Sequence, residues 1–132
     1  MNRQKVFDTV LTHLRTQNRR AVNGSGGCVY RSPEGLKCAI GCLIPDELYR
    51  SSMEGTTVSG LLADYPELDA YFRMDENEDS TFEYRSGTYE TNYQLLQEFQ
   101  MVHDFSLEDL EFGMLRIART FKLEYAAPKK EG

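Results

Sequence analysis

The chain has 132 residues, of which 40% are hydrophobic, with 8 Tyr and 7 Phe among them. This composition excludes wholesale disorder, and the length is typical of one domain. We therefore expect a single globular domain over residues 1–125 and a flexible basic tail over residues 126–132. No apolar run approaches the ~20 residues that a membrane span needs, and the first residues carry no apolar signal core. The sequence predicts a cytoplasmic protein without a membrane partner.

Charge is distributed unevenly along the chain, whose formal net charge is −6. Residues 1–40 hold seven Lys and Arg against two Asp and Glu. Residues 41–112 hold three against seventeen, and residues 113–132 hold five against two. A net acidic protein is poorly suited to general nucleic-acid binding, because such binding neutralises phosphates with cations. We therefore expect a protein partner with a basic surface and no direct general binding of nucleic acid.

The three cysteines, Cys28, Cys38 and Cys42, follow a C-x9-C-x3-C pattern. Their odd number argues against a set of disulfides, and the pattern lacks the paired C-x2-C spacing of a structural zinc site. We expect three free thiols, packed as small apolar side chains, and neither a metal nor another cofactor.

Apolar spacing predicts a first helix that ends at the glycine-rich run Asn23–Gly27. Its apolar stripe consists of Val6, Phe7, Val10, Leu11 and Leu14. Two short extended runs, 28–31 and 36–39, flank a Ser-Pro-Glu-Gly turn at 32–35, which predicts a small β-hairpin. Because an isolated hairpin is only marginally stable in water, we expect this one to pack on helices.

Several short helices are predicted in the middle of the chain. A helical turn is expected at 38–43, and Pro45 is placed to open the next helix. Thr56 or Thr57 is placed to cap a further helix, and Pro66 opens another.

Two consecutive helices are predicted in the last third of the chain. Thr91-x-x-Gln94 has the form of a capping box, and Ser106-x-x-Asp109 resembles a second cap. Apolar stripes follow the two caps, at Leu95, Leu96, Phe99, Val102 and His103 and at Leu107, Leu110, Met114, Ile117, Ala118 and Phe121. The predicted fold class is mainly α (α+β with one small β-hairpin), with about five to six helices and long terminal helices packed together.

One cysteine, Cys38, is a candidate for a reactive thiol. Cys38 stands where the second extended run passes into a helical turn, and a helix N-terminus favours the thiolate. His103 lies near the end of its predicted helix with Asp104 beside it. A Cys38–His103 pair oriented by Asp104 would have the parts of a cysteine-dependent hydrolase. The simpler interpretation is a packed cysteine and a core histidine that bonds a backbone carbonyl.

Two further groups of side chains are candidates for binding. Tyr30 and Arg31 adjoin the predicted turn, where Arg31 is available for an anionic ligand or for a carboxylate such as that of Glu54. An acidic run holds Asp75, Glu76, Glu78 and Asp79, and either a small hairpin or an ordered loop follows it up to residue 89. The acidic run fits a solvated loop or, in a sharper hypothesis, a face that docks on a basic protein.

Several segments share a pattern with one family. They are Cys-Val-Tyr-Arg at 28–31, Gly-Leu-Lys-Cys-Ala-Ile-Gly-Cys-Leu-Ile-Pro-Asp-Glu-Leu-Tyr at 35–49, Glu54-Gly55, Phe-Gln-Met-Val-His-Asp at 99–104 and Ile117-Ala118. Through them, most of residues 5–122 resembles an uncharacterised family of small bacteriophage and bacterial proteins. The resemblance supplies no activity, but it singles out Tyr30, Arg31, Cys38, Gly41, Glu54, His103 and Asp104. A phage context also implies a protein that binds and blocks a host machine.

We therefore predict a small accessory protein of phage or mobile-element type that acts in the host cytoplasm. It would bind and modulate a host protein, such as a nucleic-acid enzyme or a defence component, as an inhibitor does. The alternative is a cysteine-dependent hydrolase or a small anionic-ligand binder built on Cys38, His103 and Asp104. The sequence leaves the oligomeric state open.

Overall fold

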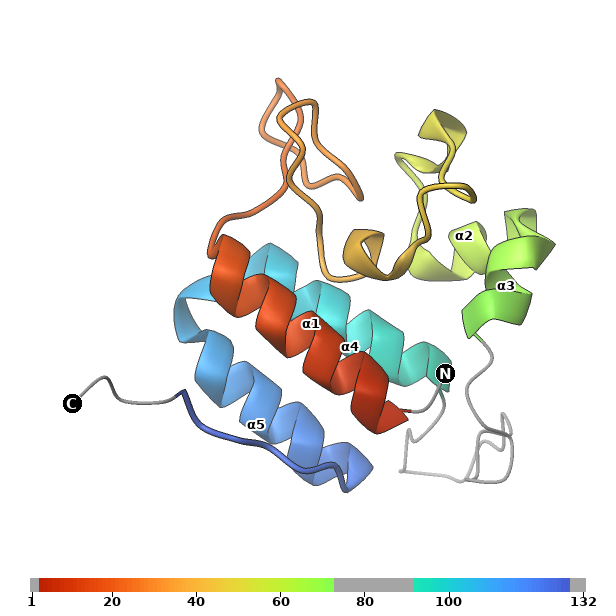
Figure 1. Cartoon of the computed structure of the whole chain (residues 1–132). Coiled ribbons are helices and arrows are strands. Elements are labelled where there is room, and N and C mark those ends of the chain that lie inside the picture. Colours follow the sequence, from red (N-terminus) through yellow and green to blue (C-terminus); the bar gives the residue numbers. More distant parts are fainter. Residues whose placement is uncertain (1–2, 73–91, 129–132) are drawn as a thin grey trace.

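The computed structural model describes residues 3–72 and 92–128, and in these residues the prediction of a mainly helical fold is confirmed (Figure 1). The α-helices are α1 (Arg3–Gln17), α2 (Val58–Asp64), α3 (Pro66–Phe72), α4 (Asn92–Phe105) and α5 (Leu110–Phe121). Short 3-10 helices are η1 (Gly41–Leu43), η2 (Ser51–Met53) and η3 (Leu107–Asp109). No helix of the described residues is long and apolar enough to cross a membrane.

The three long helices form one layer, in which α1 lies against both α4 and α5 (Figure 1). Their predicted apolar stripes are buried between them, and the rings of Phe7 and Phe99 pack with centroids 6.1 Å apart. At Gly113 the helices α4 and α5 approach closely, since an added Cβ would lie 3.0 Å from Val102 Cγ2. The first and last helices therefore share the core, as the sequence predicted.

A loop-rich segment, residues 18–57, lies over one side of this layer, next to α2 and α3 (Figure 1). Helix α2 contacts α3 and α4, and η1 contacts α1, so this part of the chain is joined to the layer through both α1 and α4. Thr57 caps α2 by accepting a hydrogen bond from Gly60 N at 3.2 Å, and Pro66 is the first residue of α3, both as predicted. Pro45 opens only one turn, closed by Tyr49 N to Pro45 O at 3.1 Å, instead of a helix.

The small β-hairpin is not found. The described residues contain only isolated antiparallel bridges, between Arg31 and Lys37 and between Val22 and Cys28, and no strand. The predicted turn itself does form, with Gly35 N donating to Ser32 O at 3.0 Å.

The next hydrogen bond of a longer ladder would run from Tyr30 N to Cys38 O, because Cys38 N already donates to Tyr30 O, and both of these groups have other partners. Tyr30 N and Arg31 N both donate to the carboxylate of Glu54, at 2.8 and 3.0 Å. The side-chain amide of Gln17, at the end of α1, accepts from Lys37 N at 3.0 Å and donates to Lys37 O at 2.8 Å. Tyr30 N is bound to Glu54, and Cys38 O accepts from Cys42 N at 3.0 Å, so the ladder ends there. The backbone groups of Arg31 and Lys37 point away from the opposite run, and Glu54 and Gln17 satisfy them.

After α5 the chain runs back along the helical layer (Figure 1). Gln4 of α1 holds it through two bonds to the backbone of Glu124, at 2.8 and 2.9 Å. Arg15 binds the Glu111 carboxylate at 2.6 Å, and Tyr125 donates to the same carboxylate at 2.6 Å. These contacts join the chain's first helix, its last helix and the segment that follows.

Three predictions lie outside the described residues. They are the cap at Thr91, the acidic run with the segment that follows it to residue 89, and the end of the basic tail at residues 129–132.

Candidate functional site

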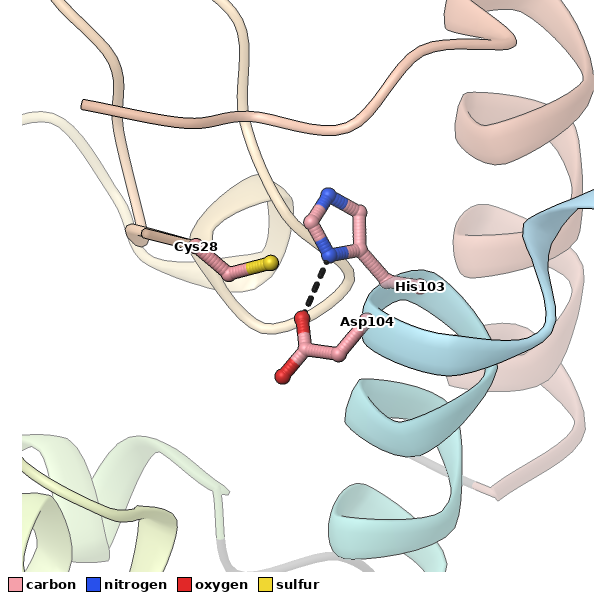
Figure 2. A group of neighbouring side chains, drawn as sticks. All are labelled: Cys28, His103 and Asp104. Atoms are coloured by element: carbon pink, nitrogen blue, oxygen red, sulfur yellow. Dashed lines mark hydrogen bonds and ion pairs between the residues drawn. The ribbon is translucent and has the colours of Figure 1, made fainter. Parts of the chain in front are cut away.

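One thiol, the buried histidine and its neighbouring carboxylate come together at the end of α4 (Figure 2). One ligand-type atom from each of Cys28, His103 and Asp104 lies within 4.8 Å of the others. His103 is fully buried, Asp104 is partly exposed, and Cys28 is exposed on the loop that follows the glycine-rich run. His103 Nδ1 lies 2.7 Å from Asp104 Oδ1, so the predicted pairing of these two residues is present.

The thiol in this cluster is Cys28 and not Cys38. Cys38 is fully buried, and its Sγ accepts a hydrogen bond from Gly41 N at 3.2 Å. Burial raises the pKa of the Cys38 thiol to about 12. Cys38 is followed by Ala39 and Ile40, and all three side chains are buried in the core. This position fits the simpler interpretation of Cys38 as a packed cysteine, and it does not fit the alternative in which Cys38 is a nucleophile favoured by a helix N-terminus.

The hydrogen bonds of His103 determine which ring nitrogen carries its proton. Ala21 N donates to His103 Nε2 at 3.0 Å, so Nε2 acts as the acceptor. A neutral imidazole has one N–H, which is therefore on Nδ1 and donates to Asp104. Both nitrogens are engaged, and neither is free to accept a proton from Cys28.

The environment of Cys28 also opposes thiolate formation. Partial burial raises the pKa of the Cys28 thiol, and the charge of Asp104 and a hydrogen bond to it raise this pKa further. A nucleophilic cysteine needs the opposite shift. The cluster is better understood as an anchor, because His103 holds Ala21 and Asp104 holds Cys28, at the two ends of the glycine-rich loop.

The same three donor types, sulfur, imidazole nitrogen and carboxylate oxygen, are those that bind zinc. A metal on His103 Nδ1 would have to replace the proton that this nitrogen shares with Asp104. The other nitrogen would then need a proton while facing the N–H of Ala21, whereas metal-bound histidines usually donate to an acceptor there. The donor set therefore fits a metal in type but not in its hydrogen bonding.

Glu54, expected to contact a ligand, instead binds the protein's own backbone. Besides Tyr30 N and Arg31 N, it accepts a hydrogen bond from Tyr49 Oη at 2.6 Å. The Tyr30 ring is buried, and its hydroxyl donates to Thr56 O at 2.6 Å. Through these bonds, Glu54 and Tyr30 connect the segment at residues 30–31 to the segment at residues 54–56.

Arg31 is likewise used internally. Its guanidinium lies 4.5 Å from the ring centroid of Tyr49, donates to Ile44 O at 2.7 Å and pairs with Asp46 at 2.9 Å. The guanidinium therefore does not pair with the Glu54 carboxylate. The backbone N–H of Arg31 binds this carboxylate instead. Tyr30, Arg31 and Glu54, expected to bind an anionic ligand, are held mainly by contacts within the protein, and among the described residues the buried Arg31 Nε has no hydrogen-bond partner.

A groove of about 450 Å³ opens beside the cluster. One wall is the outer face of α4, formed by Gln97, Gln100, Met101, Asp104 and Phe105. Residues 54–58 and 28–30 supply the rest of the lining. The α4 residues lie three, four, seven and eight positions after the first, which places them on one side of the helix.

Met101 and Phe105 are the site residues that the sequence analysis missed. Both are large and apolar, yet 49% and 74% exposed respectively. The sequence carried one signal that these two side chains would be exposed: both fall outside the apolar stripe that α4 buries.

Comparisons with protein-family models, curated proteins and solved structures found no match to this chain. The resemblance to the small phage and bacterial family stays a prediction, and the function is argued from the chain's own residues. The partner surface expected at Asp75, Glu76, Glu78 and Asp79 lies outside the described residues.

Proposed function

We propose that this protein acts by binding another protein, and that the groove beside α4 is its docking face. The observation that carries the proposal is the exposure of Met101 and Phe105, one turn apart, along the groove. Domains of this size bury most side chains of this kind, and grouped exposed ones mark interaction sites. Burying a Phe or Met side chain on a partner contributes about 1.5–3 kcal/mol, which is enough to make each a binding hot spot.

A binding role agrees with the accessory protein expected from the sequence, a factor that modulates a host protein. The alternative, a cysteine-dependent hydrolase, has less support. Cys38 is buried with a pKa of about 12, and Cys28 has a raised pKa beside a histidine whose two nitrogens are engaged. In this proposal the acidic run at 75–79 is a second docking element for a partner with a basic surface.

A matched pair of phenylalanines allows the groove to be tested inside cells. Phe105 lines the groove, whereas Phe112 on α5 does not, and the two are 74% and 72% exposed. Each would be replaced in turn by the photo-crosslinking amino acid p-benzoylphenylalanine in the chain at its natural expression level. Because crosslinking requires contact, we expect a discrete protein adduct from position 105 and little or none from position 112.

The control is circular dichroism of both purified variants, which should match the unsubstituted protein. Equal adduct yields at the two positions would mean that exposed aromatic rings are trapped without regard to the groove. That result, or the absence of any adduct at position 105, would contradict the proposal.

A further inference from the structure

The groove has a one-sided charge. Among the described residues that line it, the charged side chains are Glu54 and Asp104, and no Lys, Arg or His accompanies them. Asp104 accepts hydrogen bonds from the neutral ring of His103 and from Gln100 Nε2, the latter at 3.1 Å. Glu54 accepts from backbone N–H groups and a tyrosine hydroxyl. These partners are uncharged, so among the described residues neither carboxylate is paired with a cation.

Two arginines lie near the groove, and each is paired with a carboxylate that does not line it, although Arg20 also acts on Cys28. Arg31 pairs with Asp46, and Arg20 pairs with the Glu108 carboxylate at 2.9 Å while its Nε donates to the backbone carbonyl of Asp104. Asp104 also lies in the last turn of α4, where the helix dipole presents its negative end. The field in the groove therefore favours a cation and repels phosphate groups.

Apolar surface lies within reach of these carboxylates. Met101 and Phe105 share the α4 wall with Asp104, and all three lie within the span of five residues. A volume of about 450 Å³ is near the lower end of the range for ligand sites, so it admits a few side chains of an extended segment.

Resting on the proposed function, we infer that the groove receives a partner segment in which a Lys or Arg stands within two residues of a bulky apolar side chain. The cation lies toward Asp104 and Glu54, and the apolar side chain packs on Met101 and Phe105. This arrangement satisfies both kinds of surface that the groove presents, and neither a nucleic acid nor a purely apolar helix does so.

Three acetylated and amidated pentapeptides test the inference with the intact chain. The full probe is Ala-Phe-Ala-Arg-Ala, the neutral probe has Gln in place of Arg, and the third probe has Ala in place of Phe. Binding is measured from backbone amide shifts in two-dimensional NMR spectra. We expect the full probe to shift residues 28–30, 54–58 and 97–105 and to bind at least tenfold more tightly than either control. Its affinity should fall as salt is raised, because salt screens exposed charges.

Charge changes at one position on the groove wall provide a second, independent measurement. Gln97→Lys should weaken binding of the full probe by about threefold and Gln97→Glu should strengthen it by a similar factor, as for exposed ion pairs. Thr120→Lys, on an exposed part of α5 away from the groove, is the matched control and should leave the affinity unchanged.

Each other outcome overturns the inference. Equal binding of the neutral probe would remove the role of the cation. Equal binding of the probe without Phe, or of spermidine, would identify a site for cations alone. No shift in the groove at millimolar peptide would show that this chemistry is wrong. In each case a crosslink from position 105 would still support protein binding by the groove, so failure of the inference and failure of the proposed function are distinguishable.

Discussion

Asp104 and Glu54 each bind donors from segments that are distant in the sequence. Asp104 connects the end of α4 to Cys28, and Glu54 connects its loop to Tyr30 and Arg31. A carboxylate accepts several hydrogen bonds at once, and bonds to a charged acceptor are stronger than those between neutral groups. At the scale of single residues, these two side chains connect loops that lack regular strand pairing.

Thiol labelling tests the environment of Cys28. In the native protein we expect iodoacetamide to modify Cys28, while Cys38 and Cys42, whose burial raises each pKa to about 12, react only after unfolding. Asp104→Asn removes a negative charge that raises the pKa of Cys28, so the midpoint of its pH–rate profile should move to lower pH. Mass spectrometry identifies the labelled residue. An unchanged midpoint would show that Asp104 does not act on this thiol.

A tight contact at Gly41 gives a stability prediction. A Cβ added at Gly41 would lie 1.9 Å from the backbone oxygen of Tyr30, so the two segments would have to separate. We expect Gly41→Ala to lower the free energy of unfolding by about 3 kcal/mol, at the upper end for overpacking. Gly24→Ala is the control, because a Cβ there meets nothing within 4 Å. Urea denaturation of both variants measures the difference, and equal midpoints would contradict the contact.

Single residues also show where sequence reasoning stopped. The pairing of His103 with Asp104 was predictable because the two are adjacent. The expected packing of Cys38 agrees with its burial beside Ala39 and Ile40, whereas the alternative that paired Cys38 with His103 did not anticipate that the thiol near His103 is Cys28.

At the scale of elements, periodicity predicted the long helices well. The stripes of α1 and α5 are buried as expected because a helix with one apolar side has one way to face a core. The hairpin failed for a different reason. Its ladder ends at Tyr30 and Cys38, where Glu54 binds Tyr30 N and Cys42 N binds Cys38 O, and no local pattern indicates that a side chain as distant as Glu54 would reach this backbone group.

The contact between α1 and α5 depends on pH. The hydrogen bond from Arg15, followed by that from Tyr125, holds the pKa of Glu111 below its usual range. A folded pKa below the unfolded value of about 4.3 means that this stabilisation is present above the unfolded value and is lost as pH falls through the folded one. Because the pair is partly exposed, Glu111→Gln should cost about 1 kcal/mol or less at neutral pH.

The measurement is the free energy of unfolding of both proteins between neutral pH and about pH 2. The gap between them should close as the solution becomes more acidic. Glu67→Gln, at an exposed position on α3, controls for the loss of one carboxylate. A gap that stays constant over this range would contradict the role of the ionised Glu111.

At the scale of the whole molecule, the groove is assembled from three segments, 28–30, 54–58 and 97–105. They are far apart in the sequence and meet only because the loop-rich half lies over α4. This is why the sequence predicted several of the lining residues, Tyr30, Glu54 and Asp104 among them, without predicting a groove. Met101 and Phe105 can be recognised as exposed groove residues only once the buried side of α4 is known.

Cys28 offers the most direct test of the claim that a partner fills this groove, because it is exposed and lines it. Arg119→Cys adds a reference thiol on an exposed part of α5 outside the groove. The labelling rate of Cys28 relative to that of the reference is measured in the purified protein and in extracts of cells that express the chain at its natural level. We predict a ratio at least several-fold lower in the extract, since a docked segment shields Cys28, and an equal ratio in the two samples would contradict the account.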